Sequence, residues 1–257
     1  DAIPIRTIAV ADGIHVLIGR GGNLAVSTGQ DGVLVVDDQY AEQYEVVKNA
    51  IDKLARGGVK FLINTHWHSD HTGGNAQMGS TGATIVAHEN VRRRMSIDQV
   101  IEFFKAERPA SPSAALPVIT FKQDIAFHFN DEDIEVTHLK NAHTDGDAII
   151  HFRGANVIHT GDTFFHGRYP FIDTGSGGSV GGIIAAADKI IALSDEKTQI
   201  IPGHGELTDK RGVIEYRNML DTIHKAIATL IVSGNSVEQV VLAKPTAQFD
   251  DKWGNAF

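Results

Sequence analysis

Cysteine is absent from the 257 residues of this chain. Its absence excludes disulfide bonds, thiolate metal ligands and a cysteine nucleophile. Long apolar runs are absent as well. Because a membrane-spanning helix needs roughly 18–20 consecutive apolar residues, we expect no such segment. Proline is scarce, at 7 residues, and three of the seven fall within the stretch 108–117, which we therefore interpret as an irregular connection.

Basic residues are outnumbered, since 23 Lys and Arg stand against 32 Asp and Glu, for a formal net charge of -9. An acidic chain repels nucleic acid and anionic membrane surfaces, and the single basic run, Arg92-Arg93-Arg94, is typical of a solvated helix face. We expect a small-molecule substrate and no nucleic-acid or membrane partner; the oligomeric state stays open. The chain begins at Asp1 rather than at methionine, which is typical of a processed, exported protein or of a trimmed one. We expect a periplasmic or secreted location, with the cytoplasm as the alternative.

The sequence consists mainly of short β-rich runs and amphipathic helical stretches. Strands are expected at residues 5–10, 14–18, 24–27, 32–36, 59–63, 83–87, 134–139, 148–152, 156–160 and 198–201. Helices are expected at residues 44–54, 97–104, 180–191 and 213–230, where apolar residues recur three and four apart. Each half of the chain runs strands first and helices after. This order predicts an α/β fold of two sheet-plus-helix layers packed face to face, in a single domain spanning 1–257.

Three imidazoles and one carboxylate lie within six residues, in the stretch His66-Trp67-His68-Ser69-Asp70-His71. The stretch directly follows the apolar strand at 59–63. In an extended segment residues i and i+2 face the same side, so His66 and His68 are placed to hold one metal ion. After a turn, Asp70 and His71 point to a second ion. A polar surface loop is the alternative, but imidazole and carboxylate ligands together favour Zn²⁺.

Three later loops repeat the pattern of a β-rich run that ends with His or Asp near Gly. They carry His143, Asp162 and His204. Strand ends at one edge of a sheet sandwich converge, so distant residues can complete one site. The four loops together supply three imidazoles for one metal, two imidazoles and a carboxylate for another, and one carboxylate between. Asp37 and Asp38, which end the strand 32–36, fit either solvated turn residues or carboxylates that orient a ligand histidine.

The motif at 66–71, followed in order by His143, Asp162 and His204, resembles the metallo-β-lactamase superfamily over roughly residues 5–232. The resemblance implies a four-layer αβ/βα sandwich, with two mixed sheets inside, helices outside and two metal ions at the edge between the sheets. By position it implies that the first metal is bound by His66, His68 and His143, the second by Asp70, His71 and His204, with Asp162 bridging. The di-iron branch of the superfamily has an acidic residue where His68 stands, so the resemblance favours two zinc ions per chain.

A binuclear zinc site predicts hydrolysis, because zinc lowers the pKa of a bound water to about 7 and so supplies a hydroxide nucleophile. We expect a metal-dependent hydrolase that attacks the carbonyl of a cyclic or acyl substrate, β-lactamase-like first, with a lactonase or thioester hydrolase as the alternative. The most active lactamases of the family carry Cys where Asp162 stands and Lys where Phe165 stands. Asp at the bridging place is typical of the lactonase and thioester branches, although glutathione-thioester enzymes carry a helical C-terminal domain that this sequence does not predict. A mono-iron oxidoreductase and a non-catalytic, metal-stabilised binding protein are the alternatives from other classes.

The carbonyl oxygen also needs a group that stabilises its developing negative charge, worth roughly 3–4 kcal/mol in a comparable site. Candidates in the loop after Asp162 are His166, Arg168 and Tyr169, with Asn23 as a further one. We predict catalytic roles for Asp70, His166 and Tyr169. Each loop residue taken singly also fits an ordinary packing or surface side chain.

Overall fold

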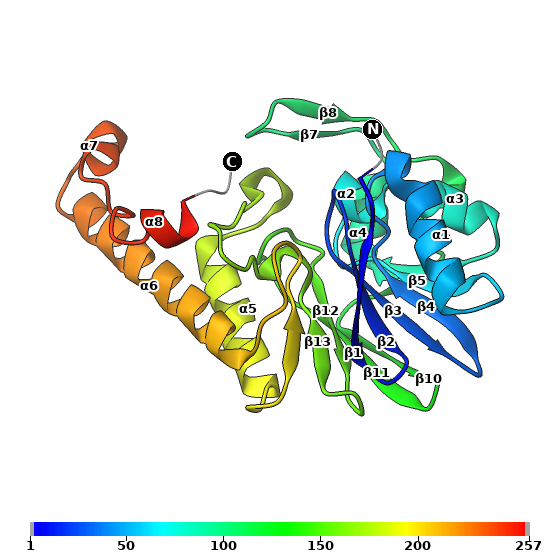
Figure 1. Ribbon diagram of the computed structural model, residues 1–257. Helices are drawn as coiled ribbons and strands as arrows, with labels where there is room; N and C mark the ends of the chain where they lie inside the picture. Colours follow the sequence, from blue (N-terminus) through cyan, green and yellow to red (C-terminus); the bar gives the residue numbers. More distant parts are fainter. Residues whose placement is uncertain (1–2, 255–257) are drawn as a thin grey trace.

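Two sheets lie face to face at the centre of the computed structural model, which describes residues 3–254, and helices cover their outer sides (Figure 1). The first sheet has the strand order β1-β2-β3-β4-β5-β6-β9, with bounds Arg6–Ala11, Ile14–Ile18, Leu24–Gly29, Gly32–Val36, Val59–Ile63, Thr84–His88 and Ile119–Phe121. The second has the order β10-β11-β12-β13-β14, with bounds Asp124–Phe129, Glu132–His138, Ala148–Phe152, Val157–His159 and Gln199–Ile201. The α/β sandwich expected from the sequence is thereby confirmed.

Helices cover the first sheet on one side and the second on the other. The α-helices are α1 (Tyr44–Leu54), α2 (Ser69–Thr72), α3 (Asn75–Ser80), α4 (Glu89–Met95), α5 (Val180–Leu193), α6 (Lys210–Val232), α7 (Val237–Leu242) and α8 (Asp250–Trp253). Short 3-10 turns lie at η1 (Ala41–Gln43), η2 (Ser113–Ala115), η3 (Gly161–Thr163) and η4 (Thr174–Ser176). Among the described residues, no helix has both the length and the apolarity to cross a bilayer.

The strand pairing follows from the turn residues. Strands β1 to β4 form an antiparallel meander whose turns use Gly13 (φ 69°) and Gly32 (φ 122°), a backbone conformation that glycine adopts without a Cβ clash. Helix α1 then crosses over, so β4, β5, β6 and β9 pair in parallel. Strands β10 to β13 are antiparallel, and α5 returns the chain to a parallel β14.

Three apolar clusters hold these layers together. The inner faces of both sheets meet in one cluster that includes the fully buried Leu34, Ile63 and Phe152. Helix α1 buries Val47 and Ile51 against the outer face of the first sheet, and α5 and α6 cover the outer face of the second. The apolar stripe of each helix thus faces a sheet, as its three-and-four spacing predicts.

The prediction of a helix at residues 97–104 is wrong. The segment forms a hairpin of β7 (Gln99–Ile101) and β8 (Ala106–Arg108), which Figure 1 shows projecting from the sandwich. Its apolar residues do not share a buried face, because Val100 is 50% and Phe104 48% exposed while Ile101 is buried. A helix without a buried face gains little from its apolar spacing, so the short β-rich runs pair with each other instead.

Candidate metal centre

One edge of the sandwich collects the loops that carry the ligand-type residues. The turn after β5 lies there, and so does the β11–β12 loop. Because β13 is antiparallel to β12 and parallel to β14, the carboxyl ends of β13 and β14 meet the same edge. A backbone hydrogen bond from Ala148 N–H to the Thr65 carbonyl (2.8 Å) joins the two sheets at this point. All four loops predicted from the sequence therefore converge.

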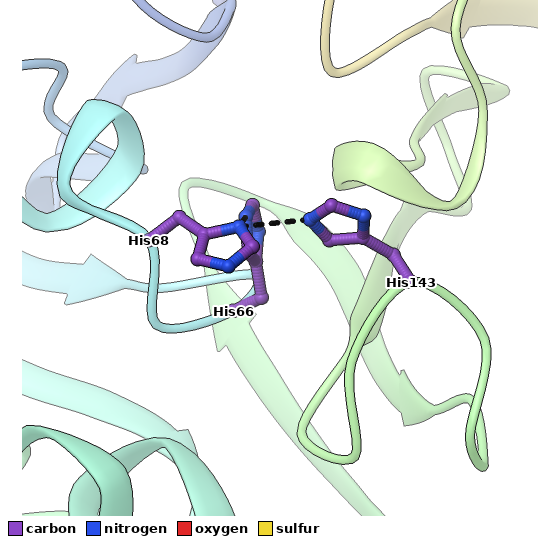
Figure 2. Close-up of side chains that lie close together, drawn as sticks. All are labelled: His66, His68 and His143. Carbon is purple, nitrogen blue, oxygen red and sulfur yellow. Dashed lines mark hydrogen bonds between the residues drawn. The ribbon is translucent and has the colours of Figure 1, made fainter. Parts of the chain in front are cut away.

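Three imidazoles form the first group, from two loops that lie on different sheets (Figure 2). His66 Nε2 lies 3.1 Å from His68 Nδ1, and His143 Nε2 lies 2.9 Å from the same atom. All three side chains are buried. In Figure 2 the ring nitrogens of His66, His68 and His143 point toward one common point, which is the arrangement that a single metal ion requires.

The second group combines Asp70, His71, Asp162 and His204, whose ligand atoms all lie within 4.8 Å of one another. His204 Nε2 lies 3.2 Å from Asp70 Oδ2 and 3.5 Å from Asp162 Oδ2. His71 Nε2 lies 3.1 Å from Asp162 Oδ1.

Asp162 also faces the first group. Its Oδ2 atom lies 3.8 Å from His66 Nε2 and 3.6 Å from His143 Nε2. The Asp162 carboxylate therefore stands between the two groups. The structure brings all seven predicted residues together.

The hydrogen bonds of the outer ring nitrogens fix which nitrogens face inward. His68 Nε2 lies 3.0 Å from the Asp173 carboxylate and His143 Nδ1 lies 2.8 Å from the Phe171 carbonyl. Since neither oxygen can donate, each of these nitrogens must carry the hydrogen. His71 Nδ1 donates in the same way to Asp37 Oδ2, at 2.7 Å.

His66 follows the same rule through a hydroxyl. Thr65 Oγ1 donates its hydrogen to Asp37 Oδ2 (2.7 Å), so the 3.0 Å contact between Thr65 Oγ1 and His66 Nδ1 requires the imidazole to donate. A neutral imidazole carries one hydrogen, so the inner nitrogens of His66, His68 and His143 are lone pairs that face one another in a buried space. Such an arrangement fits a metal cation, which accepts all of them at once.

Charge in the two groups differs. Burial lowers the pKa of His66 well below its ordinary value and lowers that of His143 to about 4, so these two imidazoles are neutral. Burial also lowers the pKa of His71 and His204, but the Asp162 and Asp70 carboxylates outweigh it. They leave the pKa of His71 well above its ordinary value and that of His204 at about 9. The second group is thus an anionic pocket that requires positive charge, supplied by protons or by a metal ion.

Two outer carboxylates orient these ligands, and only one of them was considered from the sequence. Asp37 accepts hydrogen bonds from the Thr65 amide and hydroxyl and from His71. Its neighbour Asp38 accepts from the Gly74 amide instead and touches no ligand ring. Asp173 was missed, because it lies 105 residues from His68 and its local sequence is that of an ordinary turn.

Tight backbone packing explains two glycines of the site. A Cβ at Gly22 would lie 2.1 Å from the His71 ring, and a Cβ at Gly203 would lie 2.0 Å from Asp162 Oδ1. No side chain fits at either position without displacing a ligand. Asn23, a candidate for oxyanion stabilisation, donates its amide to the Pro202 and Gly205 carbonyls and so ties the β2–β3 loop to the His204 loop.

A cavity of about 400 Å³ opens onto the two groups and exposes Asp70, Asp162 and His204 at its base. The hairpin β7–β8 contributes Ile101, Phe104 and Arg108 to its wall. The remaining lining residues are Arg20, Tyr40, His68, Ser69, Phe165, Arg168 and Phe171. The entrance thus combines aromatic surface with three arginines.

His166 and Tyr169, predicted as catalytic, do not line this cavity. The Tyr169 hydroxyl contacts the Thr246 carbonyl (3.1 Å) and Asp250 Oδ1 (2.8 Å), so it holds the C-terminal segment. His166 Nδ1 donates to the Glu206 carbonyl at 2.8 Å. The geometry gives neither side chain access to a substrate carbonyl, whereas Arg168, from the same loop, lines the cavity. Asp70 lines the cavity as well.

Comparison with known proteins agrees with this site. Residues 24–204 match the family model described as the metallo-beta-lactamase superfamily. Hydroxyacylglutathione hydrolases from Pelagibacter ubique and Erythrobacter litoralis are 27% identical over 186 residues and 29% identical over 108 residues. These alignments cover 70% and 42% of this chain and 64% and 35% of the relatives, so the chain spans less than two thirds of their length.

Solved structures share the fold. A metallo-beta-lactamase from Pontibacter korlensis superposes with a TM-score of 0.71 at 15% identity, covering 84% of this chain and 99% of that one. The DIM-1 metallo-beta-lactamase superposes with a TM-score of 0.68 at 16% identity, covering 86% of this chain and 99% of that one. With the matched region, the shared sandwich and the buried His and Asp groups at its edge, the chain belongs to the metallo-β-lactamase superfamily.

Proposed function

We propose that this chain is a hydrolase that uses two zinc ions to hydrolyse a small-molecule acyl substrate at the bond between its carbonyl carbon and the leaving group. His66, His68 and His143 would hold one ion, and Asp70, His71 and His204 the other, with Asp162 between them. The observation that carries the proposal is the set of four inward-facing ring nitrogens, each oriented by a hydrogen bond on the far side of its ring. A nitrogen and carboxylate donor set without sulfur suits zinc.

Zinc in such a site lowers the pKa of a bound water toward 7 and polarises a carbonyl oxygen. The chain's own residues supply the rest. Asp70, held 3.2 Å from His204 at the cavity base, is an acceptor for a proton released in the reaction. Arg168 lines the same cavity and offers a cation to the developing oxyanion. Phe165 stacks on His204 with ring centroids 5.4 Å apart and fixes the imidazole orientation.

A thioester is the substrate class best supported. The curated relatives are named for hydrolysis of hydroxyacylglutathione, which is a thioester. Asp162 stands between the two ligand groups, where the resemblance implies Asp in the thioester and lactone branches. An apolar wall of Phe104 and Phe171 beside the ligands suits the acyl or thiol portion of such a molecule.

Opening of a β-lactam ring is the second candidate. The observation that favours it is Arg168 in the cavity, because a guanidinium binds a planar carboxylate in two-point contact. Phe165 weighs against efficient β-lactam hydrolysis, because the resemblance implies a lysine at this position in the most active lactamases of the family. We expect lactam hydrolysis, where it occurs, to be slower than thioester hydrolysis.

The test is a panel of chromogenic thioester, lactone and β-lactam substrates, assayed with and without a chelator alongside elemental analysis. We expect two zinc ions per chain and turnover that the chelator abolishes. His66→Ala should lose most activity while its circular dichroism stays native, and His128→Ala, an exposed histidine on β10, serves as the matched control. One iron per chain would favour an oxidoreductase instead. Complete inactivity of the zinc-loaded protein on every substrate would leave only a binding role.

A further inference from the structure

Three arginines at the cavity lack the acidic partners that most arginines of the protein have. Within 4.0 Å, Arg20, Arg108 and Arg168 make no ion pair with any carboxylate among residues 3–254. Six other arginines do form such pairs. They are Arg6, Arg93, Arg94, Arg153, Arg211 and Arg217. In a chain of net charge -9, unpaired guanidinium groups gathered at one cavity call for an external anion.

Arg20 packs on Tyr40, and Arg108 lines the same cavity. The Arg20 guanidinium carbon lies 5.5 Å from the centre of the Tyr40 ring, which is cation–π range. Burial and then the Asp70 carboxylate raise the pKa of the Tyr40 phenol, against the lowering effect of His71, Arg20 and Arg108. The phenol keeps its proton and remains a hydrogen-bond donor at neutral pH.

The backbone beneath this cluster is rigid. Gln39 accepts a hydrogen bond from Gly21 N–H and donates to the Gly22 carbonyl, both at 2.8 Å. Because Gln39 is fully buried and precedes Tyr40, its amide locks the loop that carries Arg20 against the loop that carries Tyr40. The positions are thus set before any ligand arrives, which lowers the entropy cost of binding.

Arg108 is the third residue of the cluster with Arg20 and Tyr40, and its guanidinium group has N–H donors without a partner in the described part of the chain. Its Nε atom is buried and has no hydrogen-bond partner among residues 3–254, and Nη1 reaches only the Glu107 carbonyl, at 3.1 Å. Because Nε is buried, an entering ligand would meet the terminal nitrogens, and Nη2 makes no hydrogen bond to any described residue. Asp70, an acid of the same cavity, makes no ion pair with Arg108, and its Oδ2 atom faces His204 and His71.

We propose that Arg20, Tyr40 and Arg108 form a subsite that binds a carboxylate of the substrate and selects anionic acyl compounds over neutral ones. The inference rests on the proposed hydrolytic function and names the substrate class. The reacting carbonyl would lie over Asp162 and His204, and the carboxylate would lie toward the β2–β3 loop and the hairpin β7–β8. Phe104, on the same hairpin, would contact the apolar part between them.

The test compares two acetyl thioesters of similar shape, one of 4-mercaptobenzoate and one of 4-methylbenzenethiol. We expect the zinc-loaded protein to prefer the carboxylate-bearing thioester in kcat/KM by roughly ten- to hundred-fold, as for a charged hydrogen-bonded group. The double variant Arg20→Gln with Arg108→Gln should lose that preference, mainly through KM, at unchanged zinc content. Arg153→Gln, whose arginine is exposed and pairs with Glu135, should keep it. A preference that survives in the double variant overturns the subsite.

A second measurement separates this subsite from the proposed function. Binding of benzoate to the metal-free protein, with uncharged benzamide for comparison, is followed by NMR chemical-shift titration. If neither thioester is hydrolysed but benzoate binds the wild type and not the double variant, the hydrolase proposal fails and the subsite stands. Equal benzoate binding by both proteins rejects the subsite, whatever the activity.

Discussion

Replacing Asp37 by Asn tests whether hydrogen bonds outside the ligand set decide which ring nitrogen faces the metal. Asp37 Oδ1 accepts from the Thr65 amide at 2.8 Å, and Oδ2 accepts from Thr65 Oγ1 and from His71 Nδ1, both at 2.7 Å. In Asp37→Asn an amide nitrogen takes the place of Oδ2. It donates where the carboxylate accepted, so His71 Nδ1 must become an acceptor and its hydrogen moves to Nε2.

That hydrogen then points at Asp162 Oδ1, 3.1 Å away, and removes a lone pair from the second metal group. The change spreads, because a rotated Thr65 hydroxyl donates to His66 Nδ1 and moves the His66 hydrogen inward as well. Loss of such an orienting partner lowers metal affinity by roughly 10–100-fold, or about 1.4–2.7 kcal/mol. The metal-free protein should lose only about 1 kcal/mol of stability, since every polar group keeps a partner.

The assay is zinc competition against a chromophoric chelator, with urea unfolding in excess EDTA to measure the stability of the metal-free protein. Asp38→Asn is the matched control, because Asp38 is equally buried and bonds Gly74 rather than a ligand ring. We expect near-native zinc affinity from the control. Native affinity in Asp37→Asn refutes the tautomer argument, and an equal loss in both variants assigns the effect to packing.

Acidification should release zinc from the second group before the first. The carboxylates keep His204 protonated up to about pH 9 in the metal-free protein and raise the pKa of His71 as well, so zinc must displace a proton from each imidazole. Affinity then falls by about a hundredfold per pH unit where both are protonated. Metal content measured between pH 8 and 5 checks the order. Gly203→Ala should lower zinc content, since its Cβ would lie 2.0 Å from Asp162 Oδ1, and elemental analysis of the folded variant decides it. Tyr169→Phe should lower the free energy of unfolding in urea by about 0.5–1.5 kcal/mol, because the hydrogen bonds of the hydroxyl are lost. Turnover should stay near native. A large fall in kcat would support the predicted catalytic role instead.

The wrong helix at 97–104 and the unexpected contacts of Tyr169 have one cause, which is that the environment of a side chain is not encoded by its spacing. The apolar residues near 97–104 recur at helical intervals, yet most of them stay exposed on a hairpin, so no helix forms. Tyr169 follows Asp162 closely enough to suggest catalysis, but its hydroxyl reaches Asp250, 81 residues later. The local sequence pattern does not indicate which distant segment a side chain will contact.

The sequence alone determined which residues can bind metal, because ligand chemistry depends on residue type and because loops after successive strands meet at one sheet edge. It also determined the strands and long helices that have one buried face, since burial selects the periodicity. Only the tertiary structure decided the tautomers, through the contacts of His68 with Asp173 and of His143 with the Phe171 carbonyl. It also decided that Arg20 and Arg108 face one cavity. Such contacts join residues tens to a hundred positions apart, and packing of the whole chain sets their distances.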